Sequence, residues 1–314
     1  MAKIVVSEFM DVDALRAGLA GHEVIYDEKL FCDPDRLCAV VADADALIVR
    51  NRTQVREGVL GAGKRLRAVG RLGVGLDNID VAACKARGIA VYPATGANDV
   101  SVAEYVLAAA MLLLRGSYAA TSDVAAGKWP RDALSSGREI FGKRLGLIGF
   151  GSIARETAKR AAALGMSIAA YDPLLSADDP AWRPPYGEVA SLPLEDVLAS
   201  ADIVSLHVPL TDATRGLIGR DELTLMKRDA ILINAARGGV VDEAALTGAL
   251  RAGALGGAAL DVFDKEPLGA GQGSQFSNLP NVILTPHIAG VTAESNIRVS
   301  QMIVEAIARH LEEA

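Results

Sequence analysis

The stretch from Leu145 to Asp172 constrains the fold of this chain more than any other segment. An apolar run at 145–148 leads into residues 149–154, which read GFGSIA and follow the pattern G-x-G-x-x-A. A second apolar run ends at Asp172, eighteen positions after Ala154. A glycine turn alone is weak evidence, but a strand, a glycine turn, a helix, a second strand and an acid in this order are typical of a dinucleotide-binding unit. We therefore expect a parallel α/β fold built around this unit.

The glycine turn has the features that a bound dinucleotide requires. Gly149 lets the chain turn sharply out of a strand, and Gly151 lets the backbone approach a pyrophosphate. The helix that follows points its free N–H groups and its positive dipole end at the phosphates. Asp172 can accept hydrogen bonds from the adenosine ribose and repels a 2′-phosphate. The predicted cofactor is therefore NAD rather than NADP, with contacts from Gly149, Gly151, Ser152, Ile153 and Asp172.

Short apolar runs alternate with amphipathic stretches along the whole chain, which predicts parallel sheets covered by helices on both faces. Strands are expected at 4–6, 24–26, 46–50, 66–70, 89–92, 203–206, 230–234, 258–261 and near 283. A length of 314 residues suits two domains, and a final amphipathic helix from about Thr292 is expected to return to the first. The predicted fold class is α/β, with two doubly wound parallel-sheet (Rossmann-like) domains and a cleft between them. Residues 1–98 plus 287–314 would form a flavodoxin-like substrate-binding domain, and residues 99–286 an NAD-binding Rossmann domain.

Charge and cysteine content limit the classes of partner. A net charge of −7 argues against a nucleic-acid surface, which would need clustered Lys and Arg. Cys32, Cys38 and Cys84 lack the paired spacing of a zinc site, and their odd number does not suggest a disulfide framework, so no metal is expected. The chain begins without a signal-peptide pattern, and the apolar helix at 102–114 contains Glu104 and is too short to cross a bilayer. We expect a soluble cytoplasmic protein with no membrane or nucleic-acid partner.

Two loops that follow predicted strands of the first domain are candidates for anion binding. Residues 50–53 read RNRT, and arginines flanking Asn51 favour an anion pocket over two solvated side chains. Residues 71–78 form a glycine-rich loop in which successive N–H groups could converge on a carboxylate. Asp77 or Asn78 is expected only to cap the next helix. The candidate substrate contacts are Arg50, Asn51, Arg52, Gly73, Val74 and Gly75.

Three polar residues follow predicted strands of the second domain and predict redox chemistry on an alcohol. Oxidising a hydroxyl by hydride transfer needs a base for the proton, a cation for the carboxylate and oxyanion, and a group that orients the base. His287 can be the base, Arg237 the cation, and Glu266 the orienting acid that raises the pKa of the imidazole. Each residue alone has an ordinary structural explanation, but their joint occurrence after the glycine turn favours catalysis. His207, at the end of an earlier strand, is expected to line the cofactor site.

The motifs together resemble those of the D-isomer-specific 2-hydroxyacid dehydrogenase family over nearly the whole chain. The resemblance implies that Arg237, Glu266 and His287 are the catalytic Arg, Glu and His of the family. Ala154 stands where the family more often has glycine, and it is small enough for the helix to pack on the sheet. The resemblance adds five expected NAD contacts, which are Val102, Pro209, Thr214, Ala235 and Asp261.

Within the family, residues 50–53 and 127–131 resemble the phosphoglycerate dehydrogenase branch, in which an arginine from one subunit can reach the partner's substrate. This implies a homodimer and makes Arg131 a further candidate substrate contact. The chain ends soon after the closing helix, so the regulatory domains of many such enzymes are not expected. The strings 48–53, 71–80 and 288–296 are most similar to those of sulfolactate dehydrogenases. A sulfonate would suit the arginines, because each of its oxygens accepts charge-assisted hydrogen bonds.

The expected activity is thus NAD-dependent hydride transfer to or from a small 2-hydroxy acid or 2-keto acid with a second anion, such as (S)-sulfolactate. The alternatives are 3-phosphoglycerate oxidation and general glyoxylate or hydroxypyruvate reduction. A more remote alternative is a non-enzymatic NAD(H)-sensing protein of the corepressor type.

Overall fold

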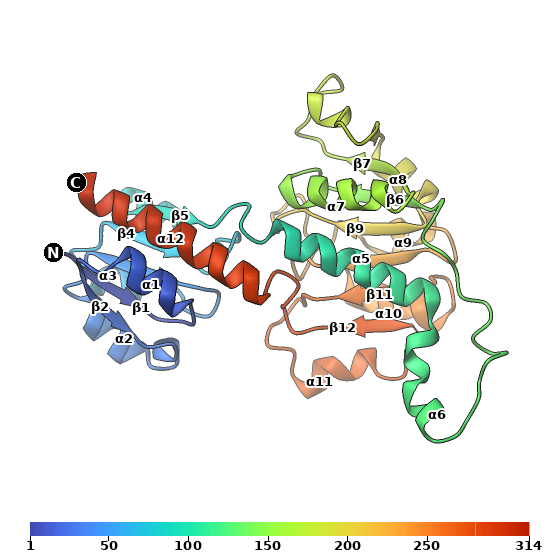
Figure 1. The fold of residues 1–314 in the computed structure, drawn as a ribbon, viewed down its shortest axis with the longest axis horizontal. Coiled ribbons are helices and arrows are strands. Elements are labelled where there is room, and N and C mark those ends of the chain that lie inside the picture. Colours follow the sequence, from blue (N-terminus) through green and yellow to red (C-terminus); the bar gives the residue numbers. More distant parts are fainter. Residues whose placement is uncertain (280, 314) are drawn as a thin grey trace. The chain divides into compact units, whose positions relative to one another are not determined.

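The computed structural model describes residues 1–279 and 281–313, which form two compact α/β units (Figure 1). The first unit contains Met1–Asn98 and the chain from Val291 onward, and the second contains Asp99–Gly290. The second crossing between the units thus lies after Gly290, not before His287 as predicted. The reason is local, because the Asp261 carboxylate accepts the N–H groups of Ile288 and Ala289, both at 2.8 Å. These bonds keep residues 287–290 with the second unit.

The first unit is built on a five-stranded parallel sheet with the order β2-β1-β3-β4-β5, in which the strand order reverses between β1 and β3. One face is covered by α1 (Val12–Gly18) and α12 (Ala293–Glu313), and the other by α2 (Pro34–Val41), α3 (Glu57–Ala62) and α4 (Val81–Ala86). The strands are β1 (Lys3–Val6), β2 (Glu23–Tyr26), β3 (Ala46–Val49), β4 (Ala68–Arg71) and β5 (Ala90–Pro93).

The C-terminal helix α12 closes the first unit because its apolar side meets the sheet at a glycine. Val299, Ile303 and Ile307 lie four residues apart and are buried. A Cβ atom at Gly70 in β4 would lie 2.5 Å from Cγ2 of Ile303. Glycine at this strand position therefore lets the helix lie directly on the sheet.

The second unit is built on a seven-stranded parallel sheet with the order β12-β11-β10-β9-β6-β7-β8. Helices α5 (Asp99–Arg115) and α7 (Ser152–Ala163) cover one face, and α8 (Leu194–Ser200), α9 (Arg220–Leu225) and α10 (Glu243–Arg251) cover the other. Short helices α6 (Thr121–Ala125) and α11 (Ala270–Gly273) lie outside these layers (Figure 1). The strands are β6 (Arg144–Ile148), β7 (Ser167–Tyr171), β8 (Ala190–Ser191), β9 (Ile203–Leu206), β10 (Ile231–Asn234), β11 (Gly257–Leu260) and β12 (Val282–Leu284).

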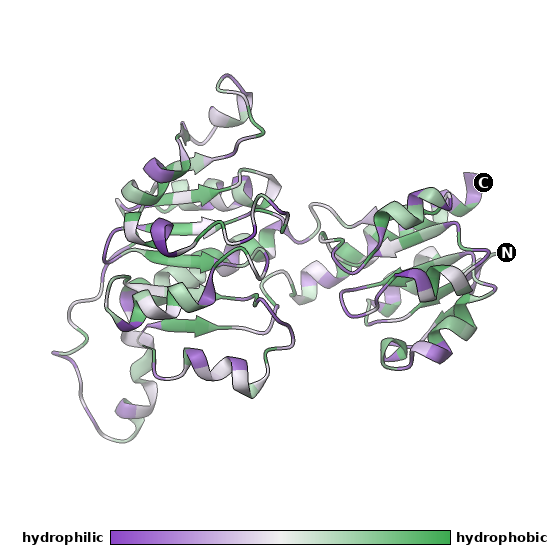
Figure 2. Ribbon diagram, turned by 180° about the vertical axis from the view of Figure 1, so that it is seen from behind, coloured by the Kyte–Doolittle hydropathy of each residue, from purple (hydrophilic) through white to green (hydrophobic). Residues whose placement is uncertain are grey.

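The structure confirms the predicted α/β class with two parallel sheets. Strands such as β3 and β10 are buried along their whole length, as expected where helices cover both faces of a parallel sheet. Figure 2 shows the strands of both sheets in hydrophobic colours. Among the described residues no single helix is long and apolar enough to cross a membrane, and α5 passes that test only as a pair with Ser117–Ala125, bent by 70°.

Candidate functional site

The predicted acid and base make a direct contact at one edge of the second sheet. Nδ1 of His287 lies 2.7 Å from Oε2 of Glu266. Glu266 follows β11 and His287 follows β12, which are neighbouring parallel strands, so their carboxyl ends meet at the same edge. Both side chains keep about a third of their surface exposed, at 36% for His287 and 32% for Glu266. The pair is therefore positioned by the sheet and remains open to a small molecule.

The Glu266 carboxylate is fixed from two sides. The Phe263 N–H donates to Oε1 at 3.0 Å, while Oε2 contacts the imidazole. Burial by itself raises the pKa of Glu266. The hydrogen bonds from His287 and Phe263, together with the charges of His287 and Arg237, outweigh burial and hold that pKa below its ordinary value. Glu266 is consequently ionised at neutral pH and can accept a hydrogen bond from Nδ1–H, which leaves Nε2 as the reactive nitrogen.

The loop that carries His287 is held by a partly buried chain of hydrogen bonds that ends on Asp261. The backbone of His287 has a φ of 54°, in the left-handed region that non-glycine residues rarely adopt. The Thr285 hydroxyl donates to the buried Asp261 carboxylate at 2.6 Å, and the Tyr105 hydroxyl of α5 lies 2.6 Å from the Thr285 oxygen. Burial raises the pKa of Tyr105, so its hydroxyl stays protonated. No pattern in the sequence indicates this chain of hydrogen bonds, because Tyr105 and Thr285 lie 180 positions apart.

Arg237 is brought to the same edge by the loop after β10. Asn234, the last residue of that strand, is buried, and its amide donates to the Arg237 carbonyl at 2.9 Å while accepting the Ala236 N–H at 3.1 Å. A Cβ atom at Gly238 would lie 1.8 Å from the Phe263 carbonyl oxygen. Glycine thus lets this loop pack against the loop that holds Glu266. The structure brings together all three residues that the sequence predicts to be catalytic.

The glycine turn lies at the reversal of strand order in the second sheet, between β6 and β9. Gly149 has a φ of 87°, and a Cβ atom there would lie 2.5 Å from the His207 carbonyl oxygen, so only glycine fits. A Cβ atom at Gly151 would meet nothing within 4 Å, which leaves space for a phosphate beside the N-terminus of α7. The Asp172 carboxylate accepts the Phe150 N–H at 2.8 Å and the Leu174 N–H at 3.0 Å, which fixes it beside the turn. These residues fit an NAD molecule.

His207 is neutral in this environment. Its Nε2 lies 3.0 Å from the Ser205 hydroxyl, and burial lowers its pKa to about 4. The side chain therefore adds no positive charge near the glycine turn. It follows β9 directly, as the predicted cofactor-lining role requires.

The other predicted cofactor contacts all lie in the second unit. The Thr214 hydroxyl donates to the Pro209 carbonyl at 2.6 Å, which braces the loop after β9. Ser152 is exposed at the start of α7, and Ile153 and Ala235 are partly buried. Val102 and Ala154 are buried where α5 and α7 meet the sheet, so alanine in place of glycine is accommodated.

The predicted anion loop, residues 50–53, follows β3 in the first unit. The Arg50 guanidinium donates to the Phe9 carbonyl at 3.3 Å and to Oδ1 of Asn296 in α12 at 2.6 Å. Burial lowers the pKa of Arg50, and the Glu8 carboxylate acts in the opposite direction. Arg52 is exposed, and Asn51 between them is exposed as well. The Arg50 guanidinium is thus hydrogen-bonded within the unit, whereas Arg52 is exposed on its surface.

The glycine loop after β4 differs in part from expectation. Gly73 has a φ of 151°, and its N–H donates to the Arg71 carbonyl at 2.8 Å, so this N–H has an internal acceptor. Val74 and Gly75 are partly buried. The prediction that Asp77 or Asn78 caps the next helix is wrong. Asp80 caps α4 by accepting the Ala83 N–H.

A family model describes the second unit. The NAD-binding domain of D-isomer-specific 2-hydroxyacid dehydrogenases matches residues 107–289, which is more than half of the chain. The chain belongs to this family. It is an NAD-dependent 2-hydroxyacid dehydrogenase, as the sequence predicted.

Curated relatives of this dehydrogenase include the (S)-sulfolactate dehydrogenase of Chromohalobacter salexigens, which is 52% identical over 99% of both chains. The D-3-phosphoglycerate dehydrogenase of Archaeoglobus fulgidus is 42% identical over 87% of this chain, which spans only 50% of that longer protein. Among solved structures, the TT0316 protein of Thermus thermophilus has a TM-score of 0.88 at 35% identity, covering 99% of this chain and 97% of that one. The predicted family and branch are confirmed.

Arg131 of the dehydrogenase is exposed in the segment between α6 and β6, and its N–H donates to the Trp129 carbonyl at 2.9 Å. A tryptophan ring is usually buried, yet 78% of Trp129 is exposed within the single chain. Within the described ranges, no group of three or more His, Cys, Asp or Glu side chains is arranged to hold a metal ion.

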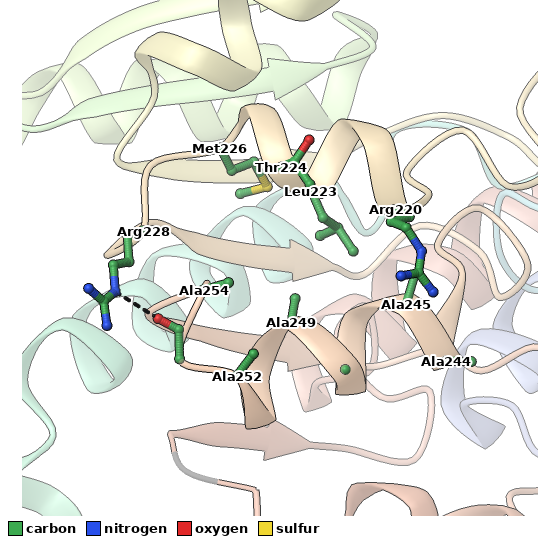
Figure 3. A pocket seen from close by; sticks show the side chains of 12 residues that line it. Arg220, Leu223, Thr224, Met226, Arg228, Ala244, Ala245, Ala249, Ala252 and Ala254 are labelled. Atoms are coloured by element: carbon green, nitrogen blue, oxygen red, sulfur yellow. Dashed lines mark hydrogen bonds between the residues drawn. The ribbon is translucent and has the colours of Figure 1, made fainter.

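A shallow pocket of about 560 Å³ lies between α9 and α10 of the dehydrogenase (Figure 3). Leu223, Met226 and several alanines line it, and Arg228 at one end donates to the Gly253 carbonyl at 3.0 Å. None of the candidate site residues lines this pocket, so it is separate from the proposed chemistry.

Proposed function

We propose that this enzyme interconverts (S)-sulfolactate and sulfopyruvate. The observation that carries the proposal is 52% identity, over 99% of both chains, with a curated (S)-sulfolactate dehydrogenase. The RNRT loop after β3 supports it, since a sulfonate is a strong acceptor for guanidinium hydrogen bonds. The configuration is consistent with a D-specific family, because the sulfonatomethyl group outranks the carboxylate in naming and a D-like sulfolactate is labelled S.

In the proposed mechanism His287 is the acid–base residue. The Glu266 carboxylate accepts a hydrogen bond from Nδ1–H and holds the ring, so Nε2 takes the substrate's hydroxyl proton during oxidation and returns it during reduction. Arg237 binds the substrate carboxylate and stabilises negative charge on the oxygen. The chemistry that NAD would supply when bound is hydride transfer to or from the substrate carbon. The glycine turn, the start of α7 and Asp172 would hold that cofactor.

The two units have different proposed tasks. The second unit binds NAD and carries the acid–base pair, and the first unit, residues 1–98 with the C-terminal helix, binds the second anion of the substrate. Arg50, Asn51, Arg52 and the loop with Gly73, Val74 and Gly75 are its proposed contacts. Arg131 is a proposed contact from a second subunit.

We also propose that the enzyme is a cytoplasmic homodimer without nucleic-acid or membrane partners. Several large apolar side chains are exposed on α5 and on the segment that follows it, as expected of a surface that another subunit covers. These are Met111, Leu112, Tyr118, Val124, Trp129 and Phe141. The three cysteines are unpaired, which fits a reducing compartment, and the net charge of −7 disfavours nucleic acid.

The experiment that tests the substrate is NADH oxidation by the purified enzyme with sulfopyruvate, 3-phosphohydroxypyruvate, hydroxypyruvate, glyoxylate and pyruvate, compared by kcat/KM. We expect sulfopyruvate to have the highest value. A preference for 3-phosphohydroxypyruvate would assign the phosphoglycerate reaction instead, and activity led by glyoxylate would assign a general keto-acid reductase. NADH binding without turnover of any acid would indicate a sensor.

A further inference from the structure

The loop that carries Arg50 and Arg52 lies where ligands bind in sheets of this type. It follows β3, and Glu8 lies two residues beyond the end of β1, so both stand at the reversal of strand order in the first sheet. Doubly wound sheets bind ligands beyond the carboxyl ends of the strands at this point. Side chains that shape this loop therefore bear directly on substrate recognition.

One buried carboxylate accepts all four N–H groups of the loop. Oε1 of Glu8 accepts from Arg50 at 2.8 Å and from Thr53 at 2.9 Å, and Oε2 accepts from Arg52 at 3.0 Å and from Asn51 at 3.3 Å. Only 3% of Glu8 is exposed. A carboxylate is buried at such a position only where hydrogen bonds compensate its charge. The loop backbone is consequently committed to Glu8 and has no N–H left for a substrate anion.

The carbonyl side of the loop is held as well. The Asn78 amide donates to the Thr53 carbonyl at 2.7 Å and to the Arg50 carbonyl at 3.3 Å, and the Thr53 hydroxyl lies 2.8 Å from that of Ser7. Both polar edges of the backbone are thus bound by other segments of the first unit. The shape of the loop is set before any substrate arrives.

The two arginines of the fixed loop differ in what they contact. The Arg50 guanidinium is bound to Phe9 and Asn296. The Arg52 guanidinium lies over the Phe31 ring of η1 (Leu30–Cys32), 5.0 Å from its centroid. Among residues 1–279 and 281–313, the hydrogen bonds of Arg52 involve only its main chain, so its guanidinium donors are not hydrogen-bonded to another group of the first unit.

We infer that Glu8 is a positioning residue for recognition of the substrate's second anion. By fixing the loop backbone, Glu8 holds Arg52, one of the proposed contacts of that anion, over the Phe31 ring. The inference rests on the proposed doubly anionic substrate. Glu8 acts through the backbone and touches no substrate atom. Phe31 supplies a cation–π contact that restrains the guanidinium and leaves its donor edge open.

The test is a double-mutant cycle on substrate selectivity, defined as kcat/KM for sulfopyruvate divided by kcat/KM for glyoxylate. Glu8→Gln replaces one acceptor oxygen with a donor that faces the loop N–H groups, so selectivity should fall about tenfold or more, mainly through KM for sulfopyruvate. Arg52→Gln should lower it further. In the Arg52→Gln background, Glu8→Gln should have no further effect on selectivity, because the group it positions is gone.

Two further variants keep the inference testable if Glu8→Gln folds poorly. Phe31→Leu removes the ring but keeps an apolar side chain, and should lower selectivity about threefold. Asp45→Asn is the matched control. Asp45 is a buried acid of the same unit that accepts the Lys3 N–H at 2.8 Å, but it precedes β3 and so lies at the opposite end of the strands. Asp45→Asn should lower the melting temperature and leave selectivity unchanged.

The outcomes separate the inference from the proposed function. If the wild-type enzyme does not prefer doubly anionic keto acids, the proposed function fails. If it does, and Glu8→Gln changes selectivity equally with and without Arg52, the inference is overturned and the function stands. Loss of selectivity in Asp45→Asn as large as in Glu8→Gln would also overturn it, because a general loosening of the unit would then explain both.

Discussion

Glu266 shows how a carboxylate can be tuned by its position in a loop. It accepts one bond from the backbone and one from His287, and its charge fixes which imidazole nitrogen is free. Glu266→Gln removes that charge while keeping the shape. We expect kcat to fall about a hundredfold or more, with NADH binding retained, in steady-state assays combined with fluorescence titration.

Glu243 offers the control for this prediction. Its carboxylate accepts the Asp264 N–H of the same loop at 2.7 Å, but from α10 and without a contact to the histidine. Glu243→Gln should keep kcat within about twofold of the wild-type value. The substitution weakens a comparable hydrogen bond to the loop but leaves the Glu266–His287 contact intact. Equal losses in both variants would mean that loop stability, and not the charge on Glu266, controls the rate.

His207 makes the stability of the second unit depend on pH. Its pKa is about 4 in the folded chain and near the ordinary 6.5 when unfolded, so the unfolded state takes up a proton as the pH falls below 6.5 and the folded state does not until about pH 4. This stability is present above pH 6.5 and is lost on acidification. From pH 7 to pH 5 the wild-type chain should lose about 2 kcal/mol of unfolding free energy that His207→Gln retains.

Both tryptophans, Trp129 and Trp182, lie in the second unit, so their fluorescence during denaturant unfolding measures this difference. The same pH dependence in both proteins would show that another group is responsible.

The location of residues that depends on chain order could be predicted from the sequence, whereas contacts that depend on tertiary register could not. Arg237, Glu266 and His287 each follow an apolar run, and parallel strands bring such positions to one edge. Glu8 and Asn78 follow strands too, but which N–H or carbonyl groups they satisfy depends on how neighbouring strands align. The sequence therefore predicts that Asp77 or Asn78 caps the next helix, whereas Asp80 caps α4 in the structure and Asn78 binds the Thr53 carbonyl.

At the scale of secondary structure, close packing of two loops orders the site. At Gly238 the loop after β10 lies so close to the loop after β11 that no side chain larger than a hydrogen atom fits between them. Gly238→Ala should displace one loop, lower stability by about 1 to 3 kcal/mol and reduce kcat, as measured by thermal unfolding and turnover.

Gly248 is the contrasting position. It lies within α10, and a Cβ atom there would meet nothing within 4 Å. Gly248→Ala should stabilise the helix by about 0.5 to 1 kcal/mol and leave turnover intact. If Gly238→Ala behaved like Gly248→Ala, the two loops would not be in the contact described.

The strands were easier to predict than the short helices and irregular segments. Predicted strands agree with the structure within about two residues, because a strand covered on both faces is a continuous apolar run. The two-residue β8 was missed, since two residues carry no periodicity. The four-residue shift of the second domain boundary has a similar cause, because the bonds that Asp261 makes to Ile288 and Ala289 leave no trace in hydrophobicity.

At the scale of the whole molecule, the exposed apolar side chains between α5 and β6 predict self-association. Trp129→Ser should weaken the proposed dimer about tenfold or more, because large aromatic side chains dominate such interfaces. Sedimentation at several micromolar concentrations measures it. Leu174→Ser is the control, since Leu174 is 91% exposed elsewhere on the second unit and should leave association unchanged. A wild-type monomer at these concentrations would contradict the dimer.

The hydrogen bonds of Glu8 determine the backbone conformation of the anion loop, residues 50–53, whereas the side chains of that loop determine which anion it would bind. The side chains of Glu8 and Asn78 hydrogen-bond only to main-chain groups of the loop. The path of the loop therefore does not depend on which side chains are present at positions 51 and 52. New substrates could then be admitted by exchanging those side chains, with the catalytic half of the enzyme untouched. Substrate specificity can thus change through side-chain substitutions in one loop of fixed backbone, which suits a fold shared by enzymes for many different hydroxy acids.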